Sequence, residues 1–316
     1  MLATAAIETT TYQRIRPYLF SVAYRMTGSA ADAEDLVQDA WIRYLDAGSP
    51  AVDSLRAYLT TTVSRLALDY LKSARVRREQ YVGPWVPEPV LTSEAIPGPA
   101  ETVEQREAVS QAFLLMLEQL TPEQRVVYVL RHGFDLSHDE IAAHLGKSPA
   151  NCRQIFHRAQ ERVDAARFTP VSLGDEHKRV VERFLQAYEA GDVAKVAALL
   201  ADDVTWVGDG GGKRLATLRP VVGADRVARG LVGYRQKYGQ LRDFHYLPAD
   251  LNGAMGLVIL IAGDVDIVTQ FDVRDGRITA VRSSRNPDKL RHLASSLGTN
   301  VTPLDEEEAR LLHHSG

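Results

Sequence analysis

Residues able to hydrogen-bond to the edges of DNA bases gather on one face of a predicted helix that begins after Ser148. Ser148 can cap this helix, and Pro149 stands at its first position. The residues at helical spacing on the apolar face are Cys152, Ile155, Phe156, Ala159 and Val163. The opposite face holds Asn151, Arg153, Gln154, His157 and Arg158. Arginine can read guanine, and asparagine or glutamine can read adenine, in the major groove. The spacing indicates DNA binding, with a plain solvated helix face as the alternative.

Two shorter helices are predicted just before this one. Thr121 and Gln124 form one capping box, and Ser137 and Glu140 form another. Gly146 can take the left-handed conformation that ends the second of these helices. A short helix, a turn containing glycine and a capped second helix are typical of a helix-turn-helix.

A second pair of helices carries opposite charges near the N-terminus. The first opens at Ser29, and its predicted buried stripe consists of Ala33, Leu36, Val37, Ala40, Trp41, Tyr44 and Leu45. Its outward face is acidic and amide-bearing, with Asp32, Asp35, Gln38 and Asp39. The next helix, from about Leu55, carries Arg56, Arg65, Lys72, Arg75, Arg77 and Arg78. The acidic face suits a basic protein partner, whereas the basic helix suits a nucleic-acid backbone.

Composition limits the classes of function that remain. The chain has 316 residues, 45% hydrophobic and 25% charged, and a formal net charge of −4, which argues against a general nucleic-acid coat. Cys152 is the one cysteine, so we expect no disulfide framework, no cysteine-rich zinc site and a reducing, cytoplasmic location. The longest apolar run, residues 256–262, is too short to span a bilayer, and the histidines lack metal-ligand spacing. We therefore expect no membrane segment, metal or cofactor.

The pattern along the chain predicts a multidomain protein. Two all-α regions, 1–79 and 105–168, flank a Pro/Gly-rich linker at 80–104. Residues 175–297 read as an α+β domain, and 298–316 as an acidic flexible tail. The predicted strands of the α+β domain are 204–207, 257–263, 266–273 and 277–284, with Asn252-Gly253 and Asp275-Gly276 as hairpin turns.

Some residues of the α+β domain could do chemistry. The run Asp209 to Lys213 contains three glycines, but its spacing is not that of a phosphate-binding loop, so we expect a flexible loop with two exposed charges. The run Asn286 to Lys289 predicts a local turn leading into the last helix. Asp209, Asp266 and His245 are candidates for acid-base work, but strand residues alternate in direction, and we expect all three at the surface. We therefore assign no catalytic residue.

The two helical regions together resemble a known family. DAEDLVQDAWIRYL followed by SLRAYLTTTVSRLALDYLKSARVRRE resembles region two of the extracytoplasmic-function sigma factors. LTPEQRVVYVLRHGFDLSHDEIAAHLGKSPANCRQIFHRAQERV resembles their region four. The chain departs from the family pattern at Cys152 and Ile155, so the fine promoter sequence is not carried over.

This resemblance implies a subunit that brings RNA polymerase core to promoter DNA. Residues implied to dock on the β′ clamp coiled coil are Asp32, Asp35, Leu36, Gln38 and Asp39. The helix from Ser54 to Arg78, with its six basic residues, is implied to engage the minus-ten element. The minus-thirty-five element is implied to meet Lys147, Ser148, Asn151, Arg153, Gln154, His157 and Arg158. The β flap is a further implied polymerase contact.

The C-terminal region resembles a second family. FLQAYEAGDVAKVAALLADDVTWVGDGGG with DGRITAVRSSRNPDKL resembles the SnoaL-like domains, which are α+β cones with a curved sheet around a pocket. A group of these sigma factors carries such a domain with a linker like YVGPWVPEP, which implies regulation in cis without a separate anti-sigma factor. The residues implied in that regulation are Trp85, Pro87, Asp209, Gly210, Gly211, Gly212, Lys213, Asn286, Pro287, Asp288 and Lys289. An unidentified small ligand in the pocket is left open.

Three functions remain at this point. The favoured hypothesis is an alternative sigma factor, a transcription initiation factor of the stress-response type, whose activity the C-terminal domain modulates. The alternatives are a ligand-sensing one-component regulator and an enzyme with helical accessory domains. The acidic docking face followed by the basic helix favours the first, since a one-component regulator needs only the helix-turn-helix.

Overall fold

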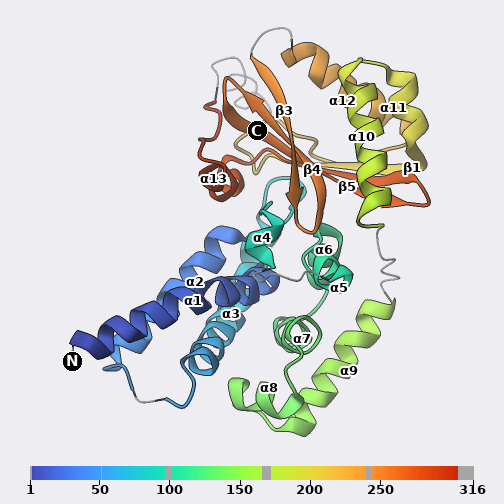
Figure 1. Ribbon diagram of the computed structural model, residues 1–316. Helices are drawn as coiled ribbons and strands as arrows, with labels where there is room; N and C mark the ends of the chain where they lie inside the picture. Colours follow the sequence, from blue (N-terminus) through green and yellow to red (C-terminus); the bar gives the residue numbers. More distant parts are fainter. Residues whose placement is uncertain (1, 51, 97–101, 166–171, 240–242, 305–316) are drawn as a thin grey trace. The chain divides into compact units, whose positions relative to one another are not determined.

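The chain forms two compact units in a computed structural model that describes residues 2–50, 52–96, 102–165, 172–239 and 243–304. The helical unit comprises residues 1–79, 93–109 and 113–169, and the C-terminal unit comprises 80–92, 110–112 and 170–316. Residues 80–92, which the sequence presents as part of a linker, thus pack with the C-terminal unit. Figure 1 shows the helical unit in blue to green and the sheet of the C-terminal unit mainly in orange.

Three long helices build the N-terminal part of the helical unit. They are α1 (Leu2–Thr27), α2 (Ala30–Asp46) and α3 (Leu55–Glu79). Ser29 caps α2 as predicted, since its hydroxyl accepts from the Asp32 amide at 3.1 Å. The buried side of α2 includes Ala33, Leu36, Val37, Ala40 and Tyr44. Leu45, placed in that stripe by the sequence, is instead 46% exposed, because it lies one position beyond the buried arc.

Shorter helices build the rest of this unit. They are α4 (Thr92–Ala95), α5 (Val103–Glu107), α6 (Gln111–Leu117), α7 (Pro122–Tyr128), the π-helical turn η1 (Val129–Gly133), α8 (His138–Leu145) and α9 (Pro149–Ala165). The predicted capping boxes at Thr121 and Ser137 are both formed. Gly146 ends α8 at φ 66° and ψ 36°, so the helix-turn-helix of α8 and α9 is as predicted.

The C-terminal unit is an α+β fold with helices on both faces of a curved mixed sheet. Its helices are α10 (Asp175–Glu189), α11 (Val193–Leu199), α12 (Ala224–Gly239) and α13 (Pro287–Ser296). Its strands are β1 (Leu200–Asp209), β2 (Val221–Val222), β3 (Phe244–Leu251), β4 (Ala254–Ile261), β5 (Asp264–Arg274) and β6 (Arg277–Ser284). The strand order is β2-β1-β6-β5-β4-β3, with β1 and β6 parallel and the other pairs antiparallel.

Turn chemistry and irregular pairing give this sheet its form. The predicted hairpins form at Asn252-Gly253 and Asp275-Gly276, where all four residues have positive φ. Register shifts interrupt the β4–β5 and β5–β6 pairs, and such bulges bend a sheet. One core packs under α10, α11 and α12, and a second packs under Leu290 and Leu293 of α13. β5 is therefore buried along nearly its whole length, while β2 and β3 are two strands that the sequence did not predict.

Candidate nucleic-acid interface and buried linker site

The outer face of α9 is open to solvent. Asn151, Arg153, Gln154, His157 and Arg158 are all exposed, whereas Cys152 and Ala159 are fully buried. The Ser148 hydroxyl accepts from the Asn151 amide at 3.2 Å and so fixes the start of the helix. Phe156 stacks on Tyr128, with ring centroids 5.7 Å apart, which holds α9 against α7. The groups that the sequence predicts to read bases thus lie together on one exposed face of α9.

Lys147 differs from the rest of this set. Its ammonium lies 3.0 Å from a carboxylate oxygen of Glu123, and its side chain is only 20% exposed. Within the helical unit, Lys147 therefore holds the start of α9 against the start of α7.

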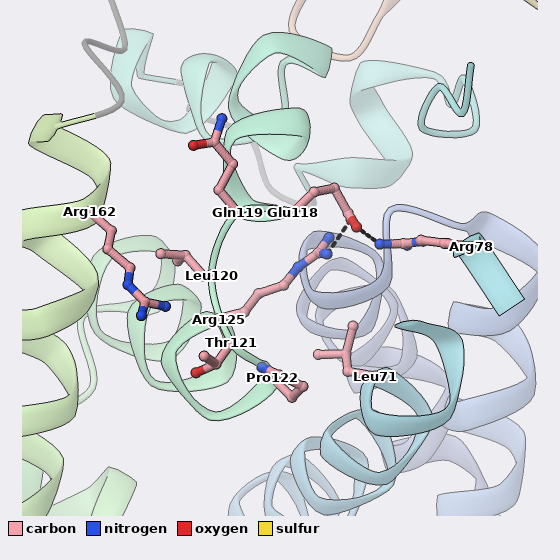
Figure 2. A pocket seen from close by; sticks show the side chains of 9 residues that line it. All are labelled: Leu71, Arg78, Glu118, Gln119, Leu120, Thr121, Pro122, Arg125 and Arg162. Carbon is pink, nitrogen blue, oxygen red and sulfur yellow. Dashed lines mark hydrogen bonds and ion pairs between the residues drawn. The ribbon is translucent and has the colours of Figure 1, made fainter. Parts of the chain in front are cut away.

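The basic residues of α3 already have contacts inside the helical unit. The Arg56 guanidinium lies 3.8 Å above the Tyr18 ring, and the Arg65 Nε donates to the His144 carbonyl at 2.8 Å. Lys72 pairs with Asp69 at 3.1 Å on the surface. Arg78 is half-buried, donates to the Thr27 carbonyl at 2.9 Å and pairs with Glu118 (Figure 2). The side chains of Arg75 and Arg77 lie outside the described part of the chain.

The predicted polymerase-docking residues of α2 divide into two groups. Asp35, Gln38 and Asp39 are exposed, but Leu36 is 8% exposed and belongs to the core. Asp32 is half-buried and accepts from the Tyr70 hydroxyl at 2.6 Å. Two exposed apolar side chains, Ile42 (43%) and Leu45 (46%), continue the outward surface of α2 toward its C-terminus. Sequence reasoning missed this apolar addition, since it took Leu45 as core.

Asp209 is the centre of a buried site in the C-terminal unit. It lies at the end of β1 with no exposed surface, which corrects its predicted place at the surface. Its carboxylate accepts from the Tyr81 hydroxyl at 2.5 Å, the Val86 amide at 2.8 Å and the Lys289 ammonium at 2.6 Å. Burial, with the Asp209 charge next in importance, raises the pKa of the Tyr81 hydroxyl far above its usual value, so Tyr81 remains a donor.

Lys289 fastens the same segment from the other side. Its ammonium also donates to the Val86 carbonyl at 2.6 Å and lies 4.3 Å from the ring centre of Trp85. Gln111 donates to the Pro87 carbonyl at 3.1 Å. Two predicted regulatory residues, Trp85 and Pro87, thus lie in the fastened segment, Trp85 beside Lys289 and Pro87 bonded to Gln111.

The glycine loop after Asp209 is tightly packed. A Cβ on Gly210 would lie 2.1 Å from the Arg214 carbonyl oxygen, and one on Gly211 would lie 2.2 Å from the Asn286 amide nitrogen. Gly211 and Gly212 have φ of 58° and 70°. The loop is therefore shaped by close backbone approach. The sequence predicted a flexible loop with two exposed charges, and only Lys213, which pairs with Asp288, is exposed, whereas Asp209 is buried.

The NPDKL turn joins this loop to the linker segment. Asn286 caps α13 through its side-chain oxygen, which accepts from the Asp288 amide at 3.1 Å, and Pro287 is the first helical residue. The side-chain nitrogen of Asn286, Nδ2, donates to the Tyr81 hydroxyl at 2.8 Å. One side chain thus caps a helix and binds the segment at the same time.

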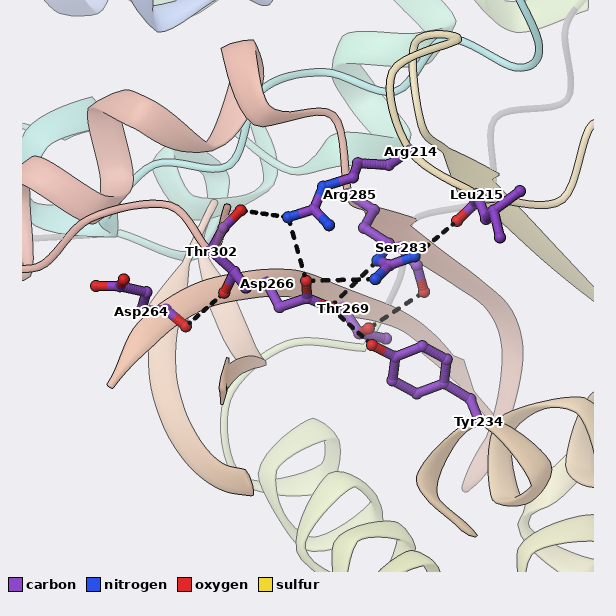
Figure 3. Close-up of polar contacts among 9 residues, drawn as sticks. All are labelled: Arg214, Leu215, Tyr234, Asp264, Asp266, Thr269, Ser283, Arg285 and Thr302. Atoms are coloured by element: carbon purple, nitrogen blue, oxygen red, sulfur yellow. Dashed lines mark hydrogen bonds and ion pairs between the residues drawn. The ribbon is translucent and has the colours of Figure 1, made fainter. Parts of the chain in front are cut away.

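A second buried carboxylate, Asp266 on β5, lies in a cluster of its own (Figure 3). It is 1% exposed and accepts from the Tyr234 hydroxyl at 2.7 Å and the Arg285 Nε at 3.1 Å. Arg214 approaches it at 3.6 Å. A cavity of about 260 Å³ adjoins this cluster, with Trp206, Tyr234 and Ile267 among its walls. The sequence placed Asp266 at the surface because strand alternation alone does not say which face is inward.

Comparison with known proteins decides the family. Family models match residues 11–77 (Sigma-70 region 2), 110–163 (Sigma-70, region 4) and 181–281 (SnoaL-like domain). The chain is 41% identical over 294 residues to ECF RNA polymerase sigma factor SigJ of Mycobacterium tuberculosis, covering 90% of this chain and 93% of that protein. It belongs to the ECF RNA polymerase sigma factors.

Further relatives agree. Probable ECF RNA polymerase sigma factor SigI of Mycobacterium tuberculosis is 31% identical over 285 residues, covering 90% of this sigma factor and 94% of the relative. The crystal structure of Mycobacterium tuberculosis SigJ matches with a TM-score of 0.70 at 35% identity, over 93% of this chain and 100% of that chain. The predicted family and fold, two helical sigma regions and a SnoaL-like α+β domain, are confirmed.

Family membership also bears on the enzyme alternative. Sigma factors are transcription initiation factors, and this chain is one of them rather than an enzyme. His245, the third acid-base candidate, is exposed and bonded to Asp243 at 2.6 Å. Among the described residues, no group of three or more potential ligands could hold a metal ion. The described helices of the sigma factor are each too short or too polar to cross a bilayer.

Proposed function

We propose that this sigma factor reads promoter DNA with α9 and α3 and docks on core polymerase through α2. The five exposed groups on α9 support readout of the minus-thirty-five element, and Arg56, Arg65 and Lys72 support contact near the minus-ten element. The acidic residues of α2, extended by Ile42 and Leu45, suit the β′ clamp coiled coil. The β flap is the partner that we propose for the region around α9. Because core polymerase and promoter DNA share one compartment, we place this activity in the bacterial cytoplasm.

We further propose that the C-terminal unit modulates initiation in cis, in place of a separate anti-sigma protein. The observation that carries this is the Asp209–Lys289 pair, which binds Tyr81, Trp85 and Val86 of the connecting segment. The far end of the segment is also fixed, because Val90 exchanges hydrogen bonds with Asn252, and Thr92 donates to Asp250 at 2.8 Å.

Fastening this segment controls how far the two sigma regions can separate. Residues 80–92 join the end of α3 to the start of α4. Free and extended, such a segment would span at most roughly 45 Å, at about 3.5 Å per residue. Bound along the C-terminal unit, it is held to one path. Release of the segment would therefore increase the distance that can open between the helix proposed to contact the minus-ten element and the helix proposed to read the minus-thirty-five element.

The decisive experiment is run-off transcription with purified core polymerase and a promoter library. Full-length protein is expected to direct specific initiation, and Arg153→Ala on α9 to reduce it strongly. Arg229→Ala is the matched control, since Arg229 is an exposed helical arginine of the C-terminal unit paired with Asp225. No specific initiation, or an equal loss in both variants, would contradict the DNA-reading assignment.

The cis assignment is tested in the same assay with Asp209→Asn. Breaking the anchor is expected to change promoter output, and the sign of the change tells whether the fastened segment represses or assists. Thr299→Ala is the control, because Thr299 bonds within the C-terminal unit to Gly263 and Asp264, away from the segment. Output unchanged by Asp209→Asn would contradict regulation through the segment.

The cavity beside Asp266 supports a small ligand as the input to this regulation. Its walls are mostly apolar, and Arg285, Ser283 and Thr217 add polar groups. At about 260 Å³ it suits a molecule of small size. Ala216→Trp, which would fill the cavity from its wall, is expected to make promoter output unresponsive to an added ligand.

A further inference from the structure

The helical unit contains a cavity of about 520 Å³ between α3 and the segment from α6 to α9. Figure 2 shows side chains that converge on it from these elements, Arg78 from the end of α3, Arg125 from α7 and Arg162 from α9. Neither the DNA-reading face of α9 nor the docking face of α2 contributes a lining residue.

The charges that line this cavity do not balance. Three guanidinium groups, those of Arg78, Arg125 and Arg162, face one carboxylate, that of Glu118, so the lining carries a formal charge of 3 − 1 = +2. Glu118 is shared, because both Arg78 and Arg125 pair with it. Arg162 donates to the side-chain oxygen of Gln124 at 2.6 Å.

Arg125 is the unusual member of this group. It is 2% exposed, and its Nε and Nη2 atoms have no hydrogen-bond partner among the described residues. Burial lowers the pKa of Arg125 to about 9, which still leaves the group charged at neutral pH. Each buried donor without an acceptor costs about 1–3 kcal/mol, or more where it is charged. In native proteins such a donor is usually met by an ordered water, an ion or a ligand, or it serves a function.

We propose that this cavity binds a small phosphate-bearing anion, held chiefly by the guanidinium of Arg125, which lines the cavity and keeps two nitrogens without a partner among the described residues. A guanidinium presents parallel N–H groups that match two oxygens of a phosphate, and a doubly charged phosphate balances the +2 lining. Arg162 on α9 supplies a second guanidinium at the wall. The cavity has room for a group larger than one phosphate, such as a diphosphate or a nucleotide.

Occupancy of this site would stabilise one arrangement of the helical unit. Arg78 belongs to α3, and Arg125 belongs to α7, so an anion between them ties these helices together. In the same arrangement Arg65 of α3 donates to the His144 carbonyl of α8. The anion thus favours a state in which a basic residue proposed to meet DNA is bonded within the protein. This consequence rests on the proposed function, whereas the site itself does not.

Calorimetry on the full-length protein tests the site without polymerase or DNA. Pyrophosphate is the first probe, with inorganic phosphate and ATP to distinguish a diphosphate from a single phosphate or a nucleotide. We expect saturable one-to-one binding of at least one probe and at least a tenfold loss of affinity in Arg125→Met. Arg229→Met, at an exposed arginine of α12, is expected to bind as the unchanged protein does. Heats equal to those of dilution would mean that no probe binds and that Arg125 contacts solvent alone, which would overturn the proposal. An equal loss of affinity in Arg125→Met and Arg229→Met would also overturn it.

A second variant guards against a folding defect. Arg162→Ala changes an exposed side chain, so the variant is expected to fold, and its affinity is expected to fall several-fold. Binding unaffected by both Arg125→Met and Arg162→Ala would overturn the assignment to this cavity. Binding of the complex with core polymerase to labelled promoter DNA then tests the consequence. The probe is expected to weaken promoter binding for the unchanged protein and not for Arg125→Met, and an equal effect on both would overturn the tie between α3 and α7.

Discussion

The two units each bury a charged centre, and the centres differ in how completely the chain satisfies them. In the C-terminal unit, Asp209 accepts three hydrogen bonds, and its partner Lys289 also bonds Val86. In the helical unit, Arg125 is almost as deeply buried, but two of its nitrogens have no acceptor within the described part of the chain. We call a centre complete when its buried polar groups find their hydrogen-bond partners within the chain, and incomplete when some do not. A complete centre stabilises one structure, whereas an incomplete one is suited to a ligand.

The largest effect is expected when the complete centre is broken. Asp209→Asn leaves the Lys289 ammonium, 7% exposed, without its carboxylate. Removing one partner of a buried ion pair typically costs about 3–5 kcal/mol, so the free energy of unfolding of the C-terminal unit should fall by about that amount. The measurement is urea unfolding followed by tryptophan fluorescence in a Trp41→Phe background, in which Trp85 and Trp206 both report on this unit.

An exposed carboxylate provides the control for this substitution. Asp225 pairs with Arg229 on the surface of α12. Asp225→Asn should therefore lower the free energy of unfolding by less than about 1 kcal/mol. If Asp209→Asn also lowered the free energy of unfolding by less than about 1 kcal/mol, the buried Asp209–Lys289 pair would contribute no more to stability than the exposed Asp225–Arg229 pair.

Acid is expected to weaken the C-terminal unit through His177. This residue is 1% exposed and bonds the Met255 carbonyl at 2.8 Å. Its pKa is lowered chiefly by burial, although its hydrogen bonds to the Met255 and Ser172 backbone, and then the charges of Asp272 and Asp250, oppose that shift. The native state therefore binds fewer protons than the unfolded state below pH about 6.5. Stability is full above that pH and falls as the pH drops, by at most about 1.4 kcal/mol per pH unit. Urea midpoints between pH 7.5 and 5.5 should be less pH-dependent in His177→Gln, and identical slopes would contradict this role.

A smaller effect is expected at the incomplete centre. Arg125→Met removes a guanidinium with orphan donors and leaves Glu118 paired with Arg78. Removing one partner of a buried pair is costly when the other charge is left unpaired, but Glu118 keeps Arg78, so the free energy of unfolding should change by less than about 1.5 kcal/mol. The check is urea unfolding followed by helical circular dichroism. A loss as large as that of Asp209→Asn would erase the contrast and show that Arg125 is a structural residue.

The sequence predicts local features of both units well. Thr121, Ser137 and Asn286 cap helices as expected, and Asn252-Gly253 makes its hairpin, because these signals act within a few residues. β3 was missed because FHYLPADL mixes polar and apolar residues and contains a proline. Ala262-Gly263, read as the end of a strand, is a further turn with positive φ.

The buried centres were less predictable. Asp209, Asp266 and Arg125 are charged residues whose burial depends on partners far away in the chain, such as Tyr81 for Asp209. The residues alone offered Asp209 as an acid-base candidate at the surface, and only the resemblance to fused sigma factors implied a regulatory role for it. Arg125 gave no signal, because an arginine near a helix start reads as an ordinary surface residue. Burial of a charge is a tertiary property, and short-range patterns do not report it.

The smallest effect is expected at Lys213, which shares the glycine loop with Asp209. Its ion pair with Asp288 is exposed, at 57% and 41%, and exposed pairs contribute about 0–1 kcal/mol. The loop is shaped instead by Gly210 and Gly211, whose missing side chains admit Arg214 and Asn286. Lys213→Ala should therefore change the free energy of unfolding by less than about 0.5 kcal/mol and promoter output little, measured beside Asp209→Asn. If Lys213→Ala altered promoter output while leaving stability unchanged, Lys213 would be a contact residue of the regulatory surface. Regulation would then depend on this surface as well as on the buried Asp209–Lys289 pair.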